Sequence, residues 1–412
     1  MHDMPSRPVR RSSRPLREPR SRLDKNLGDA SEAALARVPA AATGAILIDL
    51  AQLEANWCGL ADHVAPAECG AVVKADAYGL GAKRVIPALL AAGCRSFFVA
   101  TLDEALEARL LAPGATIYML DGLLPGMAAD VANANITPVL ATLDDIDAWS
   151  SLGSGLAESS GHAPPAALHI DTGLHRLGLS ETDLAELQRR PELTQRFDIA
   201  LIMSHLACAD EAGHPMNREQ RDTFERLRAG LPAARASLAA SDGLMLGSDF
   251  HYDLVRPGYA LYGGQAARLR VTPVGPVVRA CARILQVQDV PPGGSVGYSA
   301  SYRAPTKRRI ATIAAGYADG IFRHASATND TPGGMVAVHG QRAPIVGRVS
   351  MDLITVDVTD LTGEPPKKGD WVDLIGPDLP IEAVGAAART IGYEVLTRLG
   401  HRFHRVYLGQ DD

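Results

Sequence analysis

Short apolar runs alternate with segments of helical periodicity through roughly the first two thirds of the chain. After a leading strand at 45–50, the expected strands lie at 71–74, 97–100, 117–120, 136–140, 167–171, 200–205, 235–240 and 252–256. Amphipathic helical segments such as 102–111, 181–190 and 218–227 separate them. Eight alternating strand–helix units within about 200 residues predict a closed, TIM-like (β/α)8 barrel rather than an open doubly wound sheet.

The pattern changes after about residue 273, where short β-branched runs are separated by Pro/Gly turns such as Pro291-Pro-Gly-Gly294. This predicts a mainly β C-terminal domain over 274–412, following a barrel domain over 44–273. The leading strand at 45–50 lies outside the count of eight, so it is available to pair with the β domain. A Gly/Ser/Pro-rich patch at 151–165 is interpreted as a surface insertion in the barrel.

Residues 1–43 are rich in Arg, Pro, Ser and Ala without a sustained apolar period, which predicts a disordered tail. No apolar segment follows the arginines, so a secretory signal is not expected. Residues 1–25 carry seven Arg and one Lys against three acidic residues, whereas the whole chain has a net charge of −6. The body of the protein is therefore acidic, which argues against nucleic acid as its main partner.

The remaining composition restricts the class of protein further. Hydrophobic residues make up 46% of the chain, but no apolar run is long enough to cross a bilayer. The five cysteines are scattered, with neither CxxC spacing nor a Cys/His cluster: Cys58, Cys69, Cys94, Cys208 and Cys281. This usage is typical of a reducing compartment and predicts a cytoplasmic protein with neither a structural disulfide nor a metal site.

Polar side chains stand where the expected strands end. Lys74, His205 and Arg256 close three of the strands, while Arg176 and Ser241 lie in the loops after two others. Singly, each has a structural interpretation, such as a solvated charge for the lysine or a hydrogen-bonded core residue for the histidine. In a barrel, however, they meet at one rim, where a phosphate is commonly held after the last two strands. A lysine nucleophile, a phosphate cradle and a cation for a heteroaromatic ring are what a pyridoxal phosphate site requires.

Several motifs, in order along the chain, carry a resemblance to a known family. They are Val73-Lys-Ala-Asp-Ala-Tyr-Gly-Leu-Gly81, Asp171-Thr-Gly-Leu-His-Arg-Leu-Gly178, Met203-Ser-His-Leu-Ala-Cys-Ala-Asp210, Val255-Arg-Pro-Gly258, Leu261-Tyr-Gly263, Gly297-Tyr298, Gly316-Tyr-Ala-Asp-Gly320 and Gly347-Arg-Val-Ser-Met-Asp352. With them, the chain from about residue 45 to 408 resembles the alanine racemases, which are pyridoxal-phosphate enzymes with an eight-stranded barrel and a β domain.

The resemblance implies a homodimer with shared sites that interconverts L- and D-alanine by a two-base mechanism. Lys74 matches the lysine that forms the internal aldimine with pyridoxal phosphate. Tyr298 matches the second catalytic base, which reaches the site from the partner subunit. Arg176 matches the residue that holds the substrate carboxylate, together with the backbone N–H of Met351 from the partner.

The resemblance also assigns the cofactor contacts. Arg256 matches the arginine facing the pyridine nitrogen, where a side-chain pKa above ~12 would keep its proton in place. His205 matches the imidazole beside the ring. The phosphate-binding positions are occupied by Tyr78, Ser241, Gly258, Tyr259 and Tyr393.

Two positions depart from the family. His169 stands where a lysine, often carbamylated, usually orients the carboxylate-binding arginine, so Arg176 needs other support, such as a bound anion. Ala240 replaces the usual Asn before Ser241.

Three alternatives stay open. They are a racemase of serine or of basic amino acids, a related pyridoxal-phosphate decarboxylase, and a non-catalytic cofactor carrier. The decarboxylase signatures are absent from the sequence, and the β domain with Tyr298 argues against a carrier. The sequence does not distinguish D-alanine supply for peptidoglycan from alanine catabolism.

Overall fold

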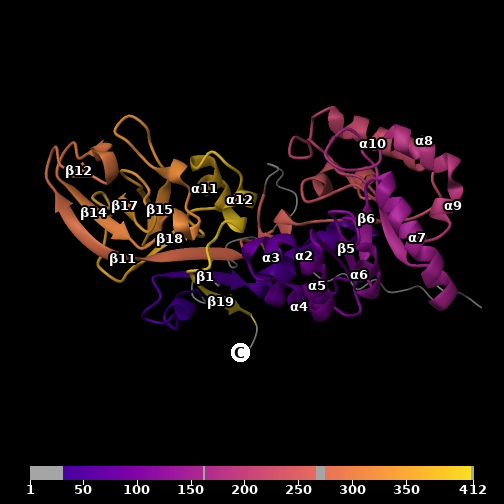
Figure 1. Ribbon diagram of the computed structural model, residues 1–412. Helices are drawn as coiled ribbons and strands as arrows, with labels where there is room; N and C mark the ends of the chain where they lie inside the picture. Colours follow the sequence, from indigo (N-terminus) through magenta and orange to yellow (C-terminus); the bar gives the residue numbers. More distant parts are fainter. Residues whose placement is uncertain (1–30, 161–162, 266–273, 410–412) are drawn as a thin grey trace, which may run out of the picture.

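Parallel strands form the centre of the first lobe in the computed structural model, which describes residues 31–160, 163–265 and 274–409 (Figure 1). Their order in the sheet is β3-β4-β5-β6-β7-β8-β9. The strands are β3 (Ala71–Val72), β4 (Ser96–Val99), β5 (Thr116–Met119), β6 (Thr137–Leu140), β7 (Pro165–His169), β8 (Asp198–Met203) and β9 (Ala236–Ser237). Most of their residues are buried, as the continuous apolar runs predicted.

The sheet closes through β10 (Leu254–Val255), which pairs in parallel with β2 (Glu68–Cys69), the segment just before β3. On the other side of β10, the Arg256 N–H donates to the Ala239 carbonyl at 2.9 Å. Each neighbour of β10 is thus tied by main-chain hydrogen bonds, and the predicted (β/α)8 barrel is confirmed.

Helices surround the barrel (Figure 1). They are α2 (Leu50–Val64), α4 (Ala82–Ala92), α5 (Leu102–Leu111), α6 (Ala128–Asn133), α7 (Leu143–Ser160), α8 (Glu181–Arg189), α9 (Pro191–Thr194) and α10 (Met216–Arg228). The predicted insertion at 151–165 is wrong, because α7 continues to Ser160 and β7 begins at Pro165. Ile146 and Trp149 bury one face of α7, and that anchor carries the helix into a segment of poor local propensity.

The second lobe is a mainly β domain built on the 13-residue strand β11 (Val278–Val290), the long strand that crosses Figure 1. Its other elements are β12 (Ser295–Val296), β13 (Tyr302–Arg303), β14 (Arg308–Ile313), β15 (Met335–Val338), β16 (Gln341–Pro344), β17 (Ile354–Asp357), β18 (Trp371–Ile375), β19 (His404–Leu408), α11 (Ile381–Ala387) and α12 (Gly392–Thr397). The leading strand β1 (Gly44–Asp49) pairs antiparallel with β11 and parallel with β19. Its predicted pairing with the β domain is confirmed.

The described residues before β1, 31–43, pack against the fold rather than forming a disordered tail. Residues 1–30 of the predicted tail lie outside the described residues, but for 31–43 the prediction is wrong. Ala34, Leu35 and Val38 are buried in a small cluster with Leu47 and Cys281. Three apolar residues are too short a pattern to show periodicity, and only the sheet that they cover makes their burial favourable.

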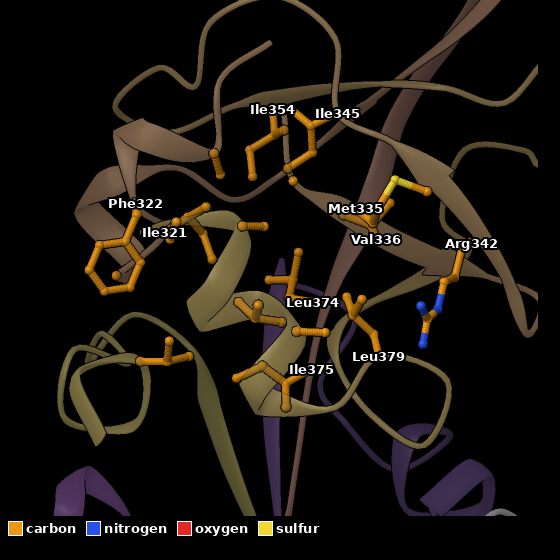
Figure 2. Close-up of a pocket in the computed structure, with 18 of the residues that line it drawn as sticks. Ile321, Phe322, Met335, Val336, Arg342, Ile345, Ile354, Leu374, Ile375 and Leu379 are labelled. Carbon is orange, nitrogen blue, oxygen red and sulfur yellow. The ribbon is translucent and has the colours of Figure 1, made fainter. Parts of the chain in front are cut away.

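An apolar cavity lies within the β domain, against α11 and strands β15 to β18 (Figure 2). The described residues that line it include Phe322, Val336, Ile345 and Leu374, and no predicted site residue is among them. The candidate site is therefore elsewhere, at the barrel rim. Among the described parts of the chain, no helix is long and apolar enough to span a membrane.

Candidate active site

Lys74 begins a left-handed turn at the end of the first barrel strand. The short element α3 (Lys74–Gly79) follows β3, and Ala75, Asp76, Ala77 and Tyr78 all have φ between 53° and 58°. A left-handed conformation costs about 1–2 kcal/mol for each non-glycine residue. Four such residues in a row persist only because surrounding contacts impose the conformation.

Hydrogen bonds fasten this turn at both ends. The Ala77 N–H donates to the Val73 carbonyl at 2.9 Å. The Asp76 carboxylate accepts from the Ala82 N–H, the first residue of α4, at 2.7 Å. Lys74 and Tyr78 are thereby held at opposite ends of one rigid turn.

Tyr78, Ser241 and Gly258 converge beside that turn. The Ser241 hydroxyl oxygen accepts from the Gly258 N–H at 2.9 Å and from the Ala260 N–H at 3.2 Å. A Cβ at Gly258 would lie 2.2 Å from the Tyr78 hydroxyl, so only glycine allows this approach. A serine hydroxyl and a phenol thus meet beside the main chain at one rim, and this cradle is an arrangement able to hold an anion.

Tyrosine rings wall this cradle. Tyr259 and Tyr393 stack with their centroids 4.0 Å apart, and the Tyr393 ring also lies 6.3 Å from that of Tyr78. The Tyr259 hydroxyl donates to Glu382 at 3.2 Å, so it is the main chain of Tyr259 that is left for an anion. Burial raises the pKa of Tyr78, Tyr259 and Tyr393 above the ordinary phenol value, which keeps all three protonated as donors.

Arg256 is buried at the centre of the rim. Its guanidinium donates to the Ser237 hydroxyl and, at 2.7 Å, to the Ser204 carbonyl, and Nη2 lies 3.5 Å from Nδ1 of His205. Burial lowers the pKa of Arg256 to about 10, and the side chain still carries its charge at neutral pH. Burial and the adjacent Arg256 lower the pKa of His205 to about 3, which keeps the imidazole neutral.

Arg176 projects from a loop that folds back on β7. The Leu179 N–H donates to the His169 carbonyl at 2.8 Å, and the Asp171 carboxylate accepts from the Gly173 and His175 N–H groups. Arg176 itself is exposed. The loop thus presents a cation toward solvent at the rim.

His169 lies buried beneath that loop as a neutral imidazole. Burial lowers its pKa to about 4, with Arg256 and Arg176 adding to the shift and Asp171 opposing it. The resemblance implies an anionic side chain at position 169 that would orient Arg176. His169 is neutral instead, so any charge compensation for Arg176 must come from elsewhere.

The lowered pKa of His169 predicts acid sensitivity. Between pH 6.5 and about 4 the unfolded chain binds a proton at this residue that the folded chain excludes, so stability falls as the pH falls. We expect His169→Asn to remove about 3 kcal/mol of this loss at pH 4. Urea unfolding at several pH values measures it, and parallel pH profiles for the variant and wild type would contradict it.

Tyr298 is not brought to Lys74 within one chain. Tyr298 follows β12, at the end of the β lobe far from α3 (Figure 1). Tyr298 is 70% exposed and Met351 53% exposed. Lys74 is exposed as well, so a single chain does not provide the desolvation that would activate its amine.

Sequence reasoning missed Gln220, a buried amide behind the rim. It donates to the Thr172 hydroxyl at 3.2 Å and to the His205 carbonyl at 3.0 Å, and it accepts from the Ala207 N–H at 2.8 Å. It therefore joins the Arg176 loop to His205. The sequence feature that could have identified Gln220 is its place in the apolar stripe of α10, four positions before the buried Phe224.

Sequence reasoning also missed Glu104, which contacts the residue after Lys74. Its carboxylate accepts from the Ala75 N–H at 2.7 Å. The only local pattern around it is Thr101-Leu-Asp-Glu104, which is typical of a helix cap. That pattern predicts a capping role for Glu104 and not a role at the site.

Pyridoxal phosphate fits these residues. The cradle at Tyr78, Ser241 and Gly258 matches a phosphate, the buried Arg256 cation matches an acceptor nitrogen, and the Lys74 amine lies on the same rim. Among the described residues, no group of three His, Cys, Asp or Glu side chains is arranged to hold a metal ion.

Two family models match the chain in succession. Residues 48–266 match the alanine racemase N-terminal domain, and residues 277–407 match the alanine racemase C-terminal domain. The chain belongs to the alanine racemase family. The barrel carries Lys74 and the cradle, and the β domain carries Tyr298 and Met351, so both halves of the family architecture are present.

The chain is also similar to individual alanine racemases over most of their length. The alanine racemase of Rhodospirillum rubrum is 45% identical over 370 residues, which span 89% of this chain and 96% of that protein. The alanine racemase structure from Bartonella henselae, which holds covalently bound pyridoxal phosphate, is 42% identical with a TM-score of 0.84 and covers 89% of this chain and 100% of that one. The biosynthetic alanine racemase of Pseudomonas aeruginosa is 32% identical with a TM-score of 0.81, again covering 89% and 100%.

Proposed function

We propose that this protein is a pyridoxal-phosphate-dependent alanine racemase that interconverts L- and D-alanine. The observation that carries the proposal is the cradle at Tyr78, Ser241 and Gly258 on the rim that bears Lys74, in a chain of that family. The relatives described above are all alanine racemases, which does not favour a serine racemase, a decarboxylase or a carrier.

The residues that would hold the cofactor divide between its two ends. The phosphate would be held by Tyr78, Ser241, Gly258, the main chain of Tyr259, and Tyr393. Arg256 and His205 would face the ring. When bound, pyridoxal phosphate supplies an electron sink that makes the Cα–H bond of the amino acid acidic. Arg256 keeps its proton at neutral pH and so donates a hydrogen bond without transferring the proton.

Racemisation requires proton removal from one face of Cα and proton delivery to the other, so two bases on opposite faces are the direct solution. Lys74 would serve one face and Tyr298 the other. Arg176, with the backbone N–H of Met351, would hold the substrate carboxylate and keep Cα between the two bases. An exposed arginine suits this role because it can meet a carboxylate with two N–H donors.

We also propose a homodimer whose sites are shared between subunits. This is supported by the separation of Tyr298 from Lys74 in one chain and by the exposure of Lys74, Tyr298 and Met351. A partner's β domain over the barrel rim would supply the second base and exclude water from the first.

Mixing two inactive variants tests the shared site. Lys74→Ala and Tyr298→Phe chains, unfolded together and refolded, should recover roughly a quarter of wild-type activity, because half of random dimers are mixed and each has one intact site. The variants refolded separately serve as controls. If the mixture shows no activity above its parents, the shared-site proposal is wrong.

The substrate is tested by incubating the purified protein with L-alanine, L-serine and L-lysine and separating the enantiomers. We expect D-alanine as the main product. D-serine or D-lysine as the main product would redirect the substrate assignment, and no D-product at all would overturn the racemase proposal.

We further propose a cytoplasmic enzyme divided near residue 273 into a barrel and a β domain. All five cysteines are free thiols, and three of them are buried, as suits a reducing compartment.

The product D-alanine could serve peptidoglycan synthesis, and the reverse direction could serve alanine catabolism. Growth of a deletion strain with and without D-alanine distinguishes the two roles.

A further inference from the structure

The carboxylate of Glu104 joins the ends of two barrel strands. One oxygen accepts from the Ala75 N–H at 2.7 Å and the other from the Ala100 N–H at 2.8 Å. Ala100 follows β4, and Ala75 follows Lys74. Both carboxylate oxygens therefore hold main chain at the rim, on either side of the boundary between β3 and β4.

This is not the role that the local sequence predicts for Glu104. In a Thr-x-x-Glu capping box the glutamate reaches back to the N–H of the threonine that caps the helix. Here the Thr101 hydroxyl does accept from the Glu104 N–H, at 3.4 Å, but the carboxylate extends past Thr101 to Ala100 and Ala75. The tertiary structure has thus diverted the side chain from capping α5 to holding the Lys74 turn.

The contact with Ala75 acts directly on Lys74. The Ala75 nitrogen belongs to the peptide unit bonded to the Lys74 Cα, so fixing that N–H fixes the rotation about the Lys74 Cα–C bond. Ala75 is also the first residue of the left-handed run, with φ of 55°. A charge-assisted hydrogen bond at this point holds the chain where it departs from ordinary backbone geometry.

We propose that Glu104 is a positioning residue for Lys74. By clamping the peptide unit after Lys74 to the end of β4, it fixes the direction in which the lysine amine leaves the strand. The inference rests on the proposed function, in which Lys74 bonds the cofactor and serves one face of the substrate. It assigns Glu104 no contact with substrate or cofactor.

Three variants of the full-length enzyme test this. Glu104→Gln keeps the length but turns an NH2 group toward one of the two N–H donors. Glu104→Asp keeps the charge but is too short to span both amides. Asp103→Asn is the matched control, since it removes a carboxylate from the same first turn of α5 at an exposed position.

Two readouts separate positioning from general stability. The first is the split between kcat and KM for alanine. The second is the rate at which added pyridoxal phosphate becomes bonded to Lys74, measured by borohydride reduction and mass analysis of the peptide carrying residue 74. Because small misplacements of catalytic groups cost up to 10²-fold, we expect Glu104→Gln to lower kcat about 10- to 100-fold with KM changed less than about threefold. Bonding to Lys74 should slow in parallel, Glu104→Asp should lie between, and Asp103→Asn should match wild type.

The outcomes are distinguishable. If Glu104→Gln matches Asp103→Asn in both readouts, the positioning role is wrong. If the Glu104 variants lose activity and cofactor bonding only in proportion to the folded fraction seen by circular dichroism, the residue is merely structural and the proposal again fails. If wild type bonds the cofactor but racemises nothing, the proposed function fails, while the rate of bonding in Glu104→Gln still decides the positioning role.

Discussion

Lys74→Ala should lower alanine racemisation by about 10⁴-fold or more, because it removes a proton-transfer base together with the amine that bonds the cofactor. The cradle formed by Tyr78, Ser241 and Gly258 does not depend on the lysine, so pyridoxal phosphate should still bind, but reversibly. Dialysis should therefore strip cofactor from the variant and not from wild type. Racemisation and cofactor retention are measured on the same preparations.

Lys83→Ala is the matched control for this experiment. Lys83 is an exposed lysine in α4, the helix that follows the Lys74 turn. Its replacement should leave racemisation and cofactor retention unchanged. A Lys74→Ala enzyme that racemises alanine at more than a few per cent of the wild-type rate would show that another group does the work assigned to Lys74.

Tyr298→Phe should lower racemisation by about 10²- to 10⁴-fold, the range expected for loss of one general acid–base group. The loss should have a signature that instability cannot produce. With Lys74 intact, one face of Cα can still exchange its proton, so in deuterium oxide one enantiomer of alanine should take up deuterium without inversion. The other enantiomer should neither exchange nor invert at a comparable rate.

The exchange is followed by the alanine Cα proton signal for each enantiomer separately. Tyr302→Phe is a suitable control, since it removes a phenol hydroxyl four residues away in the β12–β13 hairpin. Equal exchange of both enantiomers in Tyr298→Phe would mean that Tyr298 is not the base for the second face. The two-base mechanism would then need a different partner for Lys74.

The barrel was predictable because buried parallel strands are nearly continuous apolar runs, and that signal is local. The positions of Lys74, Ser241 and Arg256 at one rim then followed from topology alone, since the carboxyl ends of barrel strands share a face. The segment at 31–38 was mispredicted for the complementary reason, because its burial depends on surfaces supplied by distant strands and not on its own pattern. The end of α7 was mispredicted because its Gly/Ser composition favours a loop, whereas the buried Ile146 and Trp149 anchor the helix that continues through it.

By itself, the sequence determined the architecture, the family and the residues that meet at the rim, because the strand pattern and the order of the motifs are local properties of the chain. Only the tertiary structure decided how those residues are held. Four non-glycine residues after Lys74 adopt a left-handed turn that no local preference favours, and contacts from elsewhere in the fold maintain it. Contacts from elsewhere in the fold also determine the role of Glu104. Two main-chain amides from separate strands come together only in the folded barrel, and they bind the Glu104 carboxylate in place of the capping contact.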